Sequence, residues 1–309
     1  MLDRLKVLYS TYNLFNKSKL AHNLKLYKEL GLKKSYFSPI SSKDFENIDA
    51  SALLKPYKGT VLTTTCLFQK LSKHNQQNLV NFDKNGFAIL KNYLSIETVN
   101  QINREVEDLA KQSKVKSLNN GKVMFAFKKS KTLREVGESD QLIELLSSLM
   151  EEEVKLFQSI NFTMGSQQFT HSDSIHMTTF PLGGLMGAWI ALEDIDLDNG
   201  PLHYYPGSHK LPYFLNKDYN NEGSSLLLGN KDYPEYEKMI AQKIEEYNLT
   251  KMVFTAKAGD MIIWHANLLH GGEIHINKQK TRKSVVFHYY GKNRICYHEI
   301  TQRPALIGE

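Results

Sequence analysis

Residues 259–272 read GDMIIWHANLLHGG, a short apolar run between a Gly-Asp turn and a pair of glycines. An apolar run of this length bounded by turn residues is typical of a buried β-strand. From residue 154 onward, similar short runs rich in Val, Ile, Phe, Tyr and Thr are separated by Gly, Pro and Asn-Gly. Many short strands with regular turns favour a sandwich or a barrel. We expect a mainly β fold with flanking helices, in the form of a jelly-roll barrel.

Helical patterns lie outside this β region. Apolar residues recur at three- and four-residue spacing over residues 96–112 and 139–150, which predicts two amphipathic helices. Residues 1–80 are expected to form a basic helical extension, and residues 81–309 one β domain. Residues 233–247 interrupt the strands with a helical pattern. Either a lid at the barrel mouth or a helix packed outside the barrel fits this insertion.

The composition excludes several classes of protein. Of the 309 residues, 41% are hydrophobic and 23% are charged, which excludes global disorder. The formal net charge is +6, and the first 34 residues carry eight Lys or Arg against two acidic residues. We expect this basic segment to be a solvated face, with contact to a membrane surface or to phosphate-bearing substrates as the alternative.

The two cysteines, Cys66 and Cys296, are too few for a disulfide framework or a thiolate zinc site, which favours a reducing compartment. The N-terminal residues lack the pattern of a signal peptide, and no run of residues is long and apolar enough to span a membrane. No ladder of basic and aromatic residues indicates nucleic-acid binding. We therefore expect a cytoplasmic protein without a nucleic-acid partner, and the oligomeric state is not predicted.

Histidines are concentrated in the β region, where nine of the eleven follow residue 170. In the stretch Thr170-His171-Ser172-Asp173, alternate residues of an extended strand project to the same face, so His171 and Asp173 can converge. A histidine and a carboxylate on one face supply two ligands of a 2-His-1-carboxylate metal site. By itself the pattern is also typical of a hydrogen-bonded surface pair.

The third ligand is predicted at the end of the opening stretch, where His270 precedes two glycines. Glycines let the backbone approach closely, which suits a ligand at a strand end. We favour His270 over His265, which we expect to pack beside the site. His176 completes an H-x-D-x-x-H string, but a zinc hydrolase needs a further ligand set that the sequence lacks. We expect His176 to line the substrate side of the pocket.

A basic residue is predicted inside the barrel. Residues 281–290 read TRKSVVFHYY. If they form a strand, side-chain alternation places four of them on the same face: Arg282, Ser284, Val286 and His288. An unpaired guanidinium in a core is costly, so Arg282 needs an anionic partner. A dicarboxylate cosubstrate fits, with Arg282 binding a carboxylate and the Ser284 hydroxyl adding a donor. An internal Arg–Glu salt bridge is the alternative.

Five stretches follow one another in a recognisable order over about residues 80–292. They are FDKNGFAILKNYLS (82–95), HSDSIHM (171–177), WIALEDIDLDNGPLHYYPGSHK (189–210), GDMIIWHANLLHGG (259–272) and TRKSVVFHY (281–289). Together they resemble the phytanoyl-CoA dioxygenase family of non-haem iron(II), 2-oxoglutarate-dependent oxygenases. The resemblance implies a double-stranded β-helix, a cupin-like jelly roll, and does not extend to residues 1–80.

The resemblance also implies roles for particular residues. His171, Asp173 and His270 match the iron ligands of the family. Arg282 matches the arginine that binds the distal carboxylate of 2-oxoglutarate, and Trp189 matches a tryptophan that lines the cosubstrate pocket.

Two positions bear on how closely the chain follows the family. Relatives often have a serine where this chain has Gly272, so a hydroxyl contact to the cosubstrate is expected to be lost or moved to Ser284. Halogenating relatives replace the carboxylate ligand with a small residue, whereas this chain has Asp173. The resemblance therefore favours hydroxylation over halogenation.

The expected activity is that of an Fe(II)/2-oxoglutarate-dependent dioxygenase. With Fe(2+) bound, such an enzyme uses O2 and converts 2-oxoglutarate to succinate and CO2 while hydroxylating a small-molecule or carrier-bound metabolite. The competing hypothesis is a catalytically silent jelly-roll protein that binds a ligand. The sequence does not predict the substrate.

Overall fold

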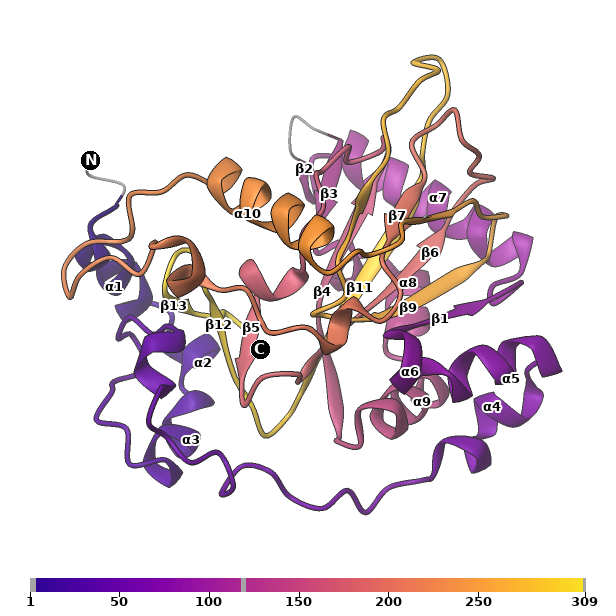
Figure 1. Cartoon of the computed structure of the whole chain (residues 1–309). Coiled ribbons are helices and arrows are strands. Elements are labelled where there is room, and N and C mark those ends of the chain that lie inside the picture. Colours follow the sequence, from indigo (N-terminus) through magenta and orange to yellow (C-terminus); the bar gives the residue numbers. More distant parts are fainter. Residues whose placement is uncertain (1–3, 118–120, 308–309) are drawn as a thin grey trace.

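A computed structural model describes residues 4–117 and 121–307 (Figure 1). Its α-helices are α1 (Lys6–Leu14), α2 (Lys17–Leu20), α3 (Asn23–Glu29), α4 (Cys66–Lys70), α5 (Lys73–Val80), α6 (Phe82–Asn85), α7 (Ile96–Lys111), α8 (Lys131–Gly137), α9 (Asp140–Met150) and α10 (Tyr233–Glu246). Helices α7, α9 and α10 confirm the three helices predicted from the sequence. No helix among the described residues is long and apolar enough to cross a membrane.

The strands are β1 (Phe87–Leu90), β2 (Lys116–Ser117), β3 (Lys122–Met124), β4 (Val154–Phe162), β5 (Thr178–Phe180), β6 (Leu185–Ala191), β7 (Leu202–Tyr204), β8 (Met252–Phe254), β9 (Met261–His265), β10 (His270–Gly272), β11 (Ser284–Gly291), β12 (Ile295–His298) and β13 (Arg303–Pro304). Seven of them form one sheet in the order β1-β9-β6-β11-β4-β3-β2. Two smaller sheets have the orders β10-β7-β8 and β13-β12-β5. All the strand pairs are antiparallel.

Side-chain alternation along the central strands divides the core into two halves. On β6, Met186 and Ala188 pack with residues of helices α7–α9, whereas Trp189 packs with residues of β7 and β8. Every residue of β6 is buried, because helices cover one face of the large sheet and the β10-β7-β8 sheet covers the other. The predicted mainly β fold with flanking helices is confirmed, as two facing antiparallel sheets.

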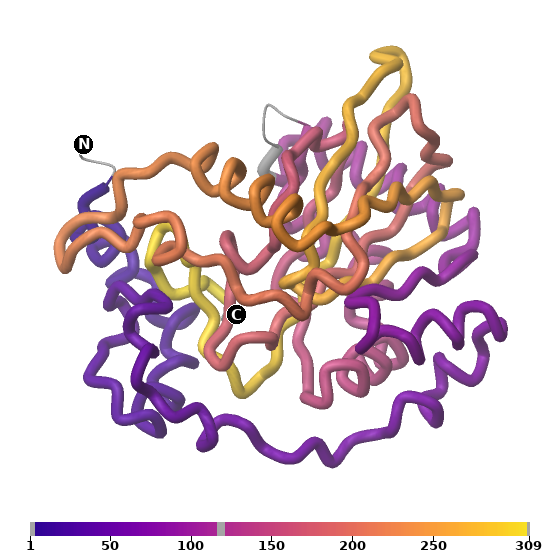
Figure 2. Tube along the Cα trace, viewed as in Figure 1, coloured from indigo at the N-terminus to yellow at the C-terminus, as the bar shows by residue number. Residues whose placement is uncertain are grey.

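The N-terminal residues wrap around one side of the sheets. In Figures 1 and 2 the segment between α3 and α4 runs along the bottom of the view, from the β13-β12-β5 sheet to the helices beside β1. Tyr27 and Phe45 pack on the β13-β12-β5 sheet, where the Phe45 ring stacks on Phe180 with centroids 4.1 Å apart. The division of the chain at residue 80 stays a prediction.

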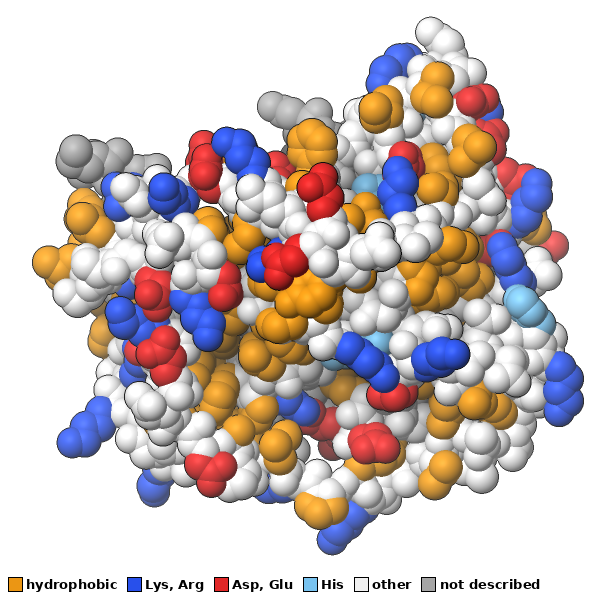
Figure 3. Space-filling model, viewed as in Figure 1, with side chains coloured by type: hydrophobic (Ala, Val, Ile, Leu, Met, Phe, Trp, Pro, Cys, Tyr) orange, Lys and Arg blue, Asp and Glu red, His pale blue; other side chains and the backbone are white. Residues whose placement is uncertain are grey.

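Acidic side chains lie between the basic ones of this extension. Lys34 pairs with Asp44 at 2.8 Å, and Lys25 lies 3.9 Å from Glu29. The surface in Figure 3 accordingly shows blue and red side chains mixed around the N-terminal helices. This mixture reduces the local field of the eight basic residues counted in the sequence.

A buried carboxylate joins the extension to the C-terminal strands. Glu299 accepts hydrogen bonds from the Ser42 hydroxyl at 2.7 Å and from the backbone N–H groups of Ser42 and Asn216. The Glu299 side chain is fully buried, and burial raises its pKa against the opposing effect of these hydrogen bonds. Glu299 therefore joins three segments that are far apart in the sequence.

We expect Glu299→Ala to lower the free energy of unfolding by about 2–4 kcal/mol, because it leaves donors on the partly buried Ser42 and the buried Asn216 unpaired. Urea denaturation measures this change, and Glu245→Ala, which removes an exposed glutamate, is the control. Since burial raises the pKa of Glu299, the pH-dependent part of its contribution is greatest below the unfolded pKa and is lost as pH rises through the folded pKa, whereas the hydrogen bonds that it accepts remain. A loss no larger than that of the control would contradict the assignment.

Candidate metal centre

Two histidines from distant parts of the chain are joined through their backbones. His171 and His270 form an antiparallel bridge in which each N–H donates to the other carbonyl at 2.9 Å. Asp173 follows two residues later, at the start of a short 3-10 helix (Asp173–Ile175). Each of the three residues offers one ligand atom, and these atoms all lie within 4.8 Å of one another in the group His171, Asp173 and His270. The structure thus brings the three predicted metal ligands together.

Both imidazoles are oriented by the backbone. Nδ1 of His171 lies 2.8 Å from the Phe169 carbonyl oxygen, and Nδ1 of His270 lies 2.9 Å from that of Leu268. A carbonyl only accepts, so each Nδ1 carries the proton and each Nε2 of the neutral ring has a free lone pair. Burial holds the pKa of His171 well below its usual value, so this ring is neutral at pH 7. The arrangement fits histidines that bind a metal through Nε2.

The carboxylate between them is ionised. Burial raises the pKa of Asp173, but the neighbouring histidines and the Trp264 N–H outweigh this effect and hold it at about 2. Oδ1 of Asp173 lies 3.7 Å from His270 Nε2, and Oδ2 accepts a hydrogen bond from Trp264 Nε1 at 2.7 Å. Two imidazoles and one carboxylate, close together and largely buried, can hold a divalent metal ion.

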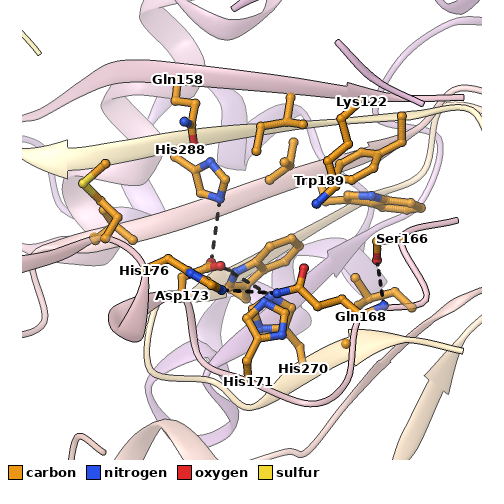
Figure 4. Close-up of a pocket in the computed structure, with 18 of the residues that line it drawn as sticks. Lys122, Gln158, Ser166, Gln168, His171, Asp173, His176, Trp189, His270 and His288 are labelled. Atoms are coloured by element: carbon orange, nitrogen blue, oxygen red, sulfur yellow. Dashed lines mark hydrogen bonds and ion pairs between the residues drawn. The ribbon is translucent and has the colours of Figure 1, made fainter. Parts of the chain in front are cut away.

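The three side chains line a cavity of about 300 Å3. Figure 4 shows Trp189, Lys122 and Ser166 on one side of this cavity and His176 and His288 toward the other. Trp189 is buried on β6 and Lys122 comes from β3. The cavity therefore has a cationic side and a histidine-rich side, with the metal centre between them.

Arg282 lines the cationic side. Its Nε donates to the Gly200 carbonyl at 3.0 Å, its Nη1 donates to the Ser284 hydroxyl at 2.9 Å, and its guanidinium lies 5.4 Å from the Trp189 ring centroid. Burial lowers the pKa of Arg282 to about 10, an effect that Glu193 partly offsets, so the group stays charged at neutral pH.

The internal Arg–Glu salt bridge that the sequence left open does not form in the described part of the chain. The nearby carboxylate of Glu193 accepts from Lys283 N and Thr281 Oγ1 instead. Arg282 is only 2% exposed and has no paired acid among the described residues. A buried cation of this kind favours an anionic ligand in the cavity.

Two hydroxyls lie near this guanidinium. Ser284 is fully buried and accepts from Arg282, but it does not line the cavity. Ser166 does line it, and its Oγ lies 2.8 Å from where a β-carbon at position 272 would be. A side chain at position 272 would therefore displace Ser166. The hydroxyl that faces the cavity beside Gly272 belongs to Ser166, which the sequence interpretation did not consider.

The structure confirms the expected position of His176 but not that of His265. His176 lines the cavity as expected, and its Nε2 lies 3.0 Å from the Tyr233 hydroxyl at the start of α10. The expectation that His265 packs beside the site is wrong. Trp264 faces the cavity, so strand alternation turns the next residue away, and His265 lies against His209 in a separate cavity.

Helix α10 contacts the segment that carries the metal centre. Besides the contact of Tyr233 with His176, the buried Tyr236 hydroxyl accepts from the backbone N–H of Ser172 at 3.3 Å. In Figure 1 the helix crosses above this region, between α1 and β7. The first turn of the insertion thus packs on the segment that carries the metal centre, behind the residues that line the cavity.

Comparisons with known proteins show which family and fold the chain is similar to. The family model "Phytanoyl-CoA dioxygenase (PhyH)" matches residues 82–284. Ectoine dioxygenase of Nocardia farcinica is 28% identical over 221 residues, covering 64% of this chain and 72% of that protein. A phytanoyl-CoA dioxygenase domain-containing protein 1 homolog of Caenorhabditis briggsae is 22% identical over 268 residues, covering 69% and 89%.

Solved structures share the fold. EctD from S. alaskensis, crystallised with 2-oxoglutarate and 5-hydroxyectoine, has a TM-score of 0.56 at 18% identity, covering 77% of this chain and 81% of that one. The non-heme alpha ketoglutarate dependent carbocyclase SnoK has a TM-score of 0.57 at 17% identity, covering 77% and 88%. The family match, which spans most of the chain, shows that this protein belongs to the phytanoyl-CoA dioxygenase (PhyH) family.

Proposed function

We propose that this protein is an Fe(II)/2-oxoglutarate-dependent oxygenase that hydroxylates a small-molecule or carrier-bound metabolite. The observation that carries the proposal is the convergence of His171, Asp173 and His270 beside a buried arginine without an acidic partner among the described residues. A metal site of two histidines and one carboxylate leaves coordination positions open for a cosubstrate and dioxygen.

Iron is the metal that this donor set and the family favour. Bound Fe(II) would supply the activation of O2, with 2-oxoglutarate oxidised to succinate and CO2 as the substrate is hydroxylated. The chain supplies orientation: the carbonyls of Phe169 and Leu268 fix both imidazoles, so that no tautomer change is needed for Nε2 to bind.

The cationic side of the cavity suits a dicarboxylate. Arg282 would bind the distal carboxylate of 2-oxoglutarate through its remaining donors, and Trp189 would pack against the carbon chain. Lys122 adds a second positive charge on the same side, and Ser166 and Ser284 add hydroxyls, one lining the cavity and one holding the guanidinium. Two cations, with no acid beside them among the residues that the structure describes, discriminate against a neutral cosubstrate.

The histidine-rich side would receive the substrate. Burial lowers the pKa of both His176 and His298 to about 4, so both rings are neutral at pH 7. Asp173 is the one carboxylate that lines the cavity in the described part of the chain, and it is assigned to the metal. No other acid among the described residues would therefore pair with an ammonium group of the substrate. We expect the reacting part of the substrate to be uncharged and to form hydrogen bonds.

Hydroxylation is proposed over other oxidative reactions. The names of similar proteins include a dioxygenase, a carbocyclase and an epimerase, so the fold supports more than one outcome. By the family resemblance, Asp173 matches the position at which halogenating relatives have a small residue, and its carboxylate supports the proposal of oxygen transfer. The free cysteines Cys66 and Cys296 agree with a reducing compartment such as the cytoplasm.

We expect the purified chain to form succinate from 2-oxoglutarate when Fe(II) and ascorbate are present, even without substrate, through uncoupled turnover. His171→Ala removes one ligand and should abolish this turnover. Succinate is measured by mass spectrometry, and His74→Ala, which removes an exposed histidine on α5, serves as the control. Absence of both turnover and iron-dependent 2-oxoglutarate binding would instead favour the silent ligand-binding protein.

We expect Arg282→Ala to weaken 2-oxoglutarate binding by about 2–5 kcal/mol, as for the loss of one partner of a desolvated charge pair. Anaerobic calorimetry with Fe(II) present measures the affinity, and Arg104→Ala, at an exposed arginine on α7, is the matched control. An affinity equal to that of the wild type would rule out Arg282 as the carboxylate-binding residue.

A further inference from the structure

We propose that Trp264 is a positioning residue that makes Asp173 a one-oxygen metal ligand. The inference rests on the proposed function, because it assigns a role toward the metal ion. It concerns a residue that the sequence placed only in an apolar strand. Three observations support it: one hydrogen bond, one ring contact and one glycine.

The hydrogen bond distinguishes the two carboxylate oxygens. Trp264 Nε1 donates to Oδ2 of Asp173 at 2.7 Å, whereas Oδ1 lies toward His270 Nε2. Among the described residues, Trp264 is the one side chain that donates a hydrogen bond to this carboxylate. His288 Nε2 lies 3.7 Å from the same Oδ2, which is beyond hydrogen-bonding distance. Oδ2 is thus engaged by the protein, and Oδ1 is free for a metal ion.

The indole also packs against a second ligand. Its ring centroid lies 4.7 Å from that of His270, at an interplanar angle of 41°. Trp264 is only 3% exposed, so the indole is fixed by its surroundings. One side chain of β9 therefore contacts two of the three residues that converge on the metal centre.

A glycine on the neighbouring strand makes room for this indole. Gly187 of β6 is the register partner of Trp264. A β-carbon at position 187 would lie 2.6 Å from Cε2 and 2.8 Å from Nε1 of Trp264. Any other residue at position 187 would push the donor nitrogen out of place. The hydrogen bond from Trp264 to Asp173 therefore requires Gly187.

The consequence is a fixed carboxylate. An Asp173 side chain without this donor can rotate, or can bring Oδ2 to the metal as a second oxygen. Partners of metal ligands commonly change metal affinity by about 10–100-fold when they are removed. Trp264→Phe removes the N–H and retains an aromatic ring beside His270, which separates the hydrogen bond from the packing.

The test is titration of the metal-free chain with Co(II), followed by calorimetry and by visible absorption, which reports the ligand geometry. We expect Trp264→Phe to raise the dissociation constant about 10–100-fold and to change the absorption bands, while the thermal midpoint of the metal-free chain changes little. Gly187→Ala should act in the same direction, and it carries the test if Trp264→Phe does not fold. Tyr289→Phe removes a buried hydrogen-bond donor that lies outside the cavity, and it should leave Co(II) affinity unchanged.

The outcomes separate this inference from the proposed function. Equal Co(II) affinity and equal spectra for the wild type and the Trp264→Phe variant would overturn the role of Trp264 alone. An equal loss in Tyr289→Phe would also overturn it, because the effect would then follow from any lost buried donor. Failure of the wild type to bind Co(II) would overturn the inference together with the metal centre.

Discussion

The reciprocal pair of backbone hydrogen bonds between His171 and His270 is the constraint on which the site depends. It joins the segment before the 3-10 helix at Asp173 to β10, across almost a hundred residues of chain. The bridge fixes the separation of the two imidazoles, and backbone carbonyls two residues earlier fix their tautomers. The ligands are therefore set by the main chain, which makes the site rigid before any metal binds.

The second constraint is the buried charge on the cationic side of the cavity. Arg282 is held by a carbonyl, a hydroxyl and the faces of two aromatic rings, none of which neutralises it. A buried guanidinium without a counter-ion is energetically unfavourable unless an anion binds beside it. The fold thus sets a cation and an anionic metal ligand in the lining of one cavity, an arrangement suited to a dicarboxylate that also reaches the metal.

Local sequence patterns predicted much of this arrangement. Spacing of apolar residues predicted helices α7, α9 and α10, and strand alternation put Arg282, Val286 and His288 on the face that lines the cavity. The same alternation shows why the expectation for His265 failed, since Trp264 and His265 cannot face the same side. Lys122 carries no local signal, because it reaches the cavity only through the pairing of β3 with β4. The hydrogen bond of Trp264 likewise depends on a glycine that lies on another strand.

Anomalous X-ray scattering from crystals of the full chain, prepared anaerobically with Fe(II) and 2-oxoglutarate, tests the central claim most directly. The account predicts one iron peak bound by His171 Nε2, Asp173 Oδ1 and His270 Nε2, with a carboxylate of 2-oxoglutarate paired with Arg282. An iron peak with other ligands, or no peak between these three side chains, would contradict it.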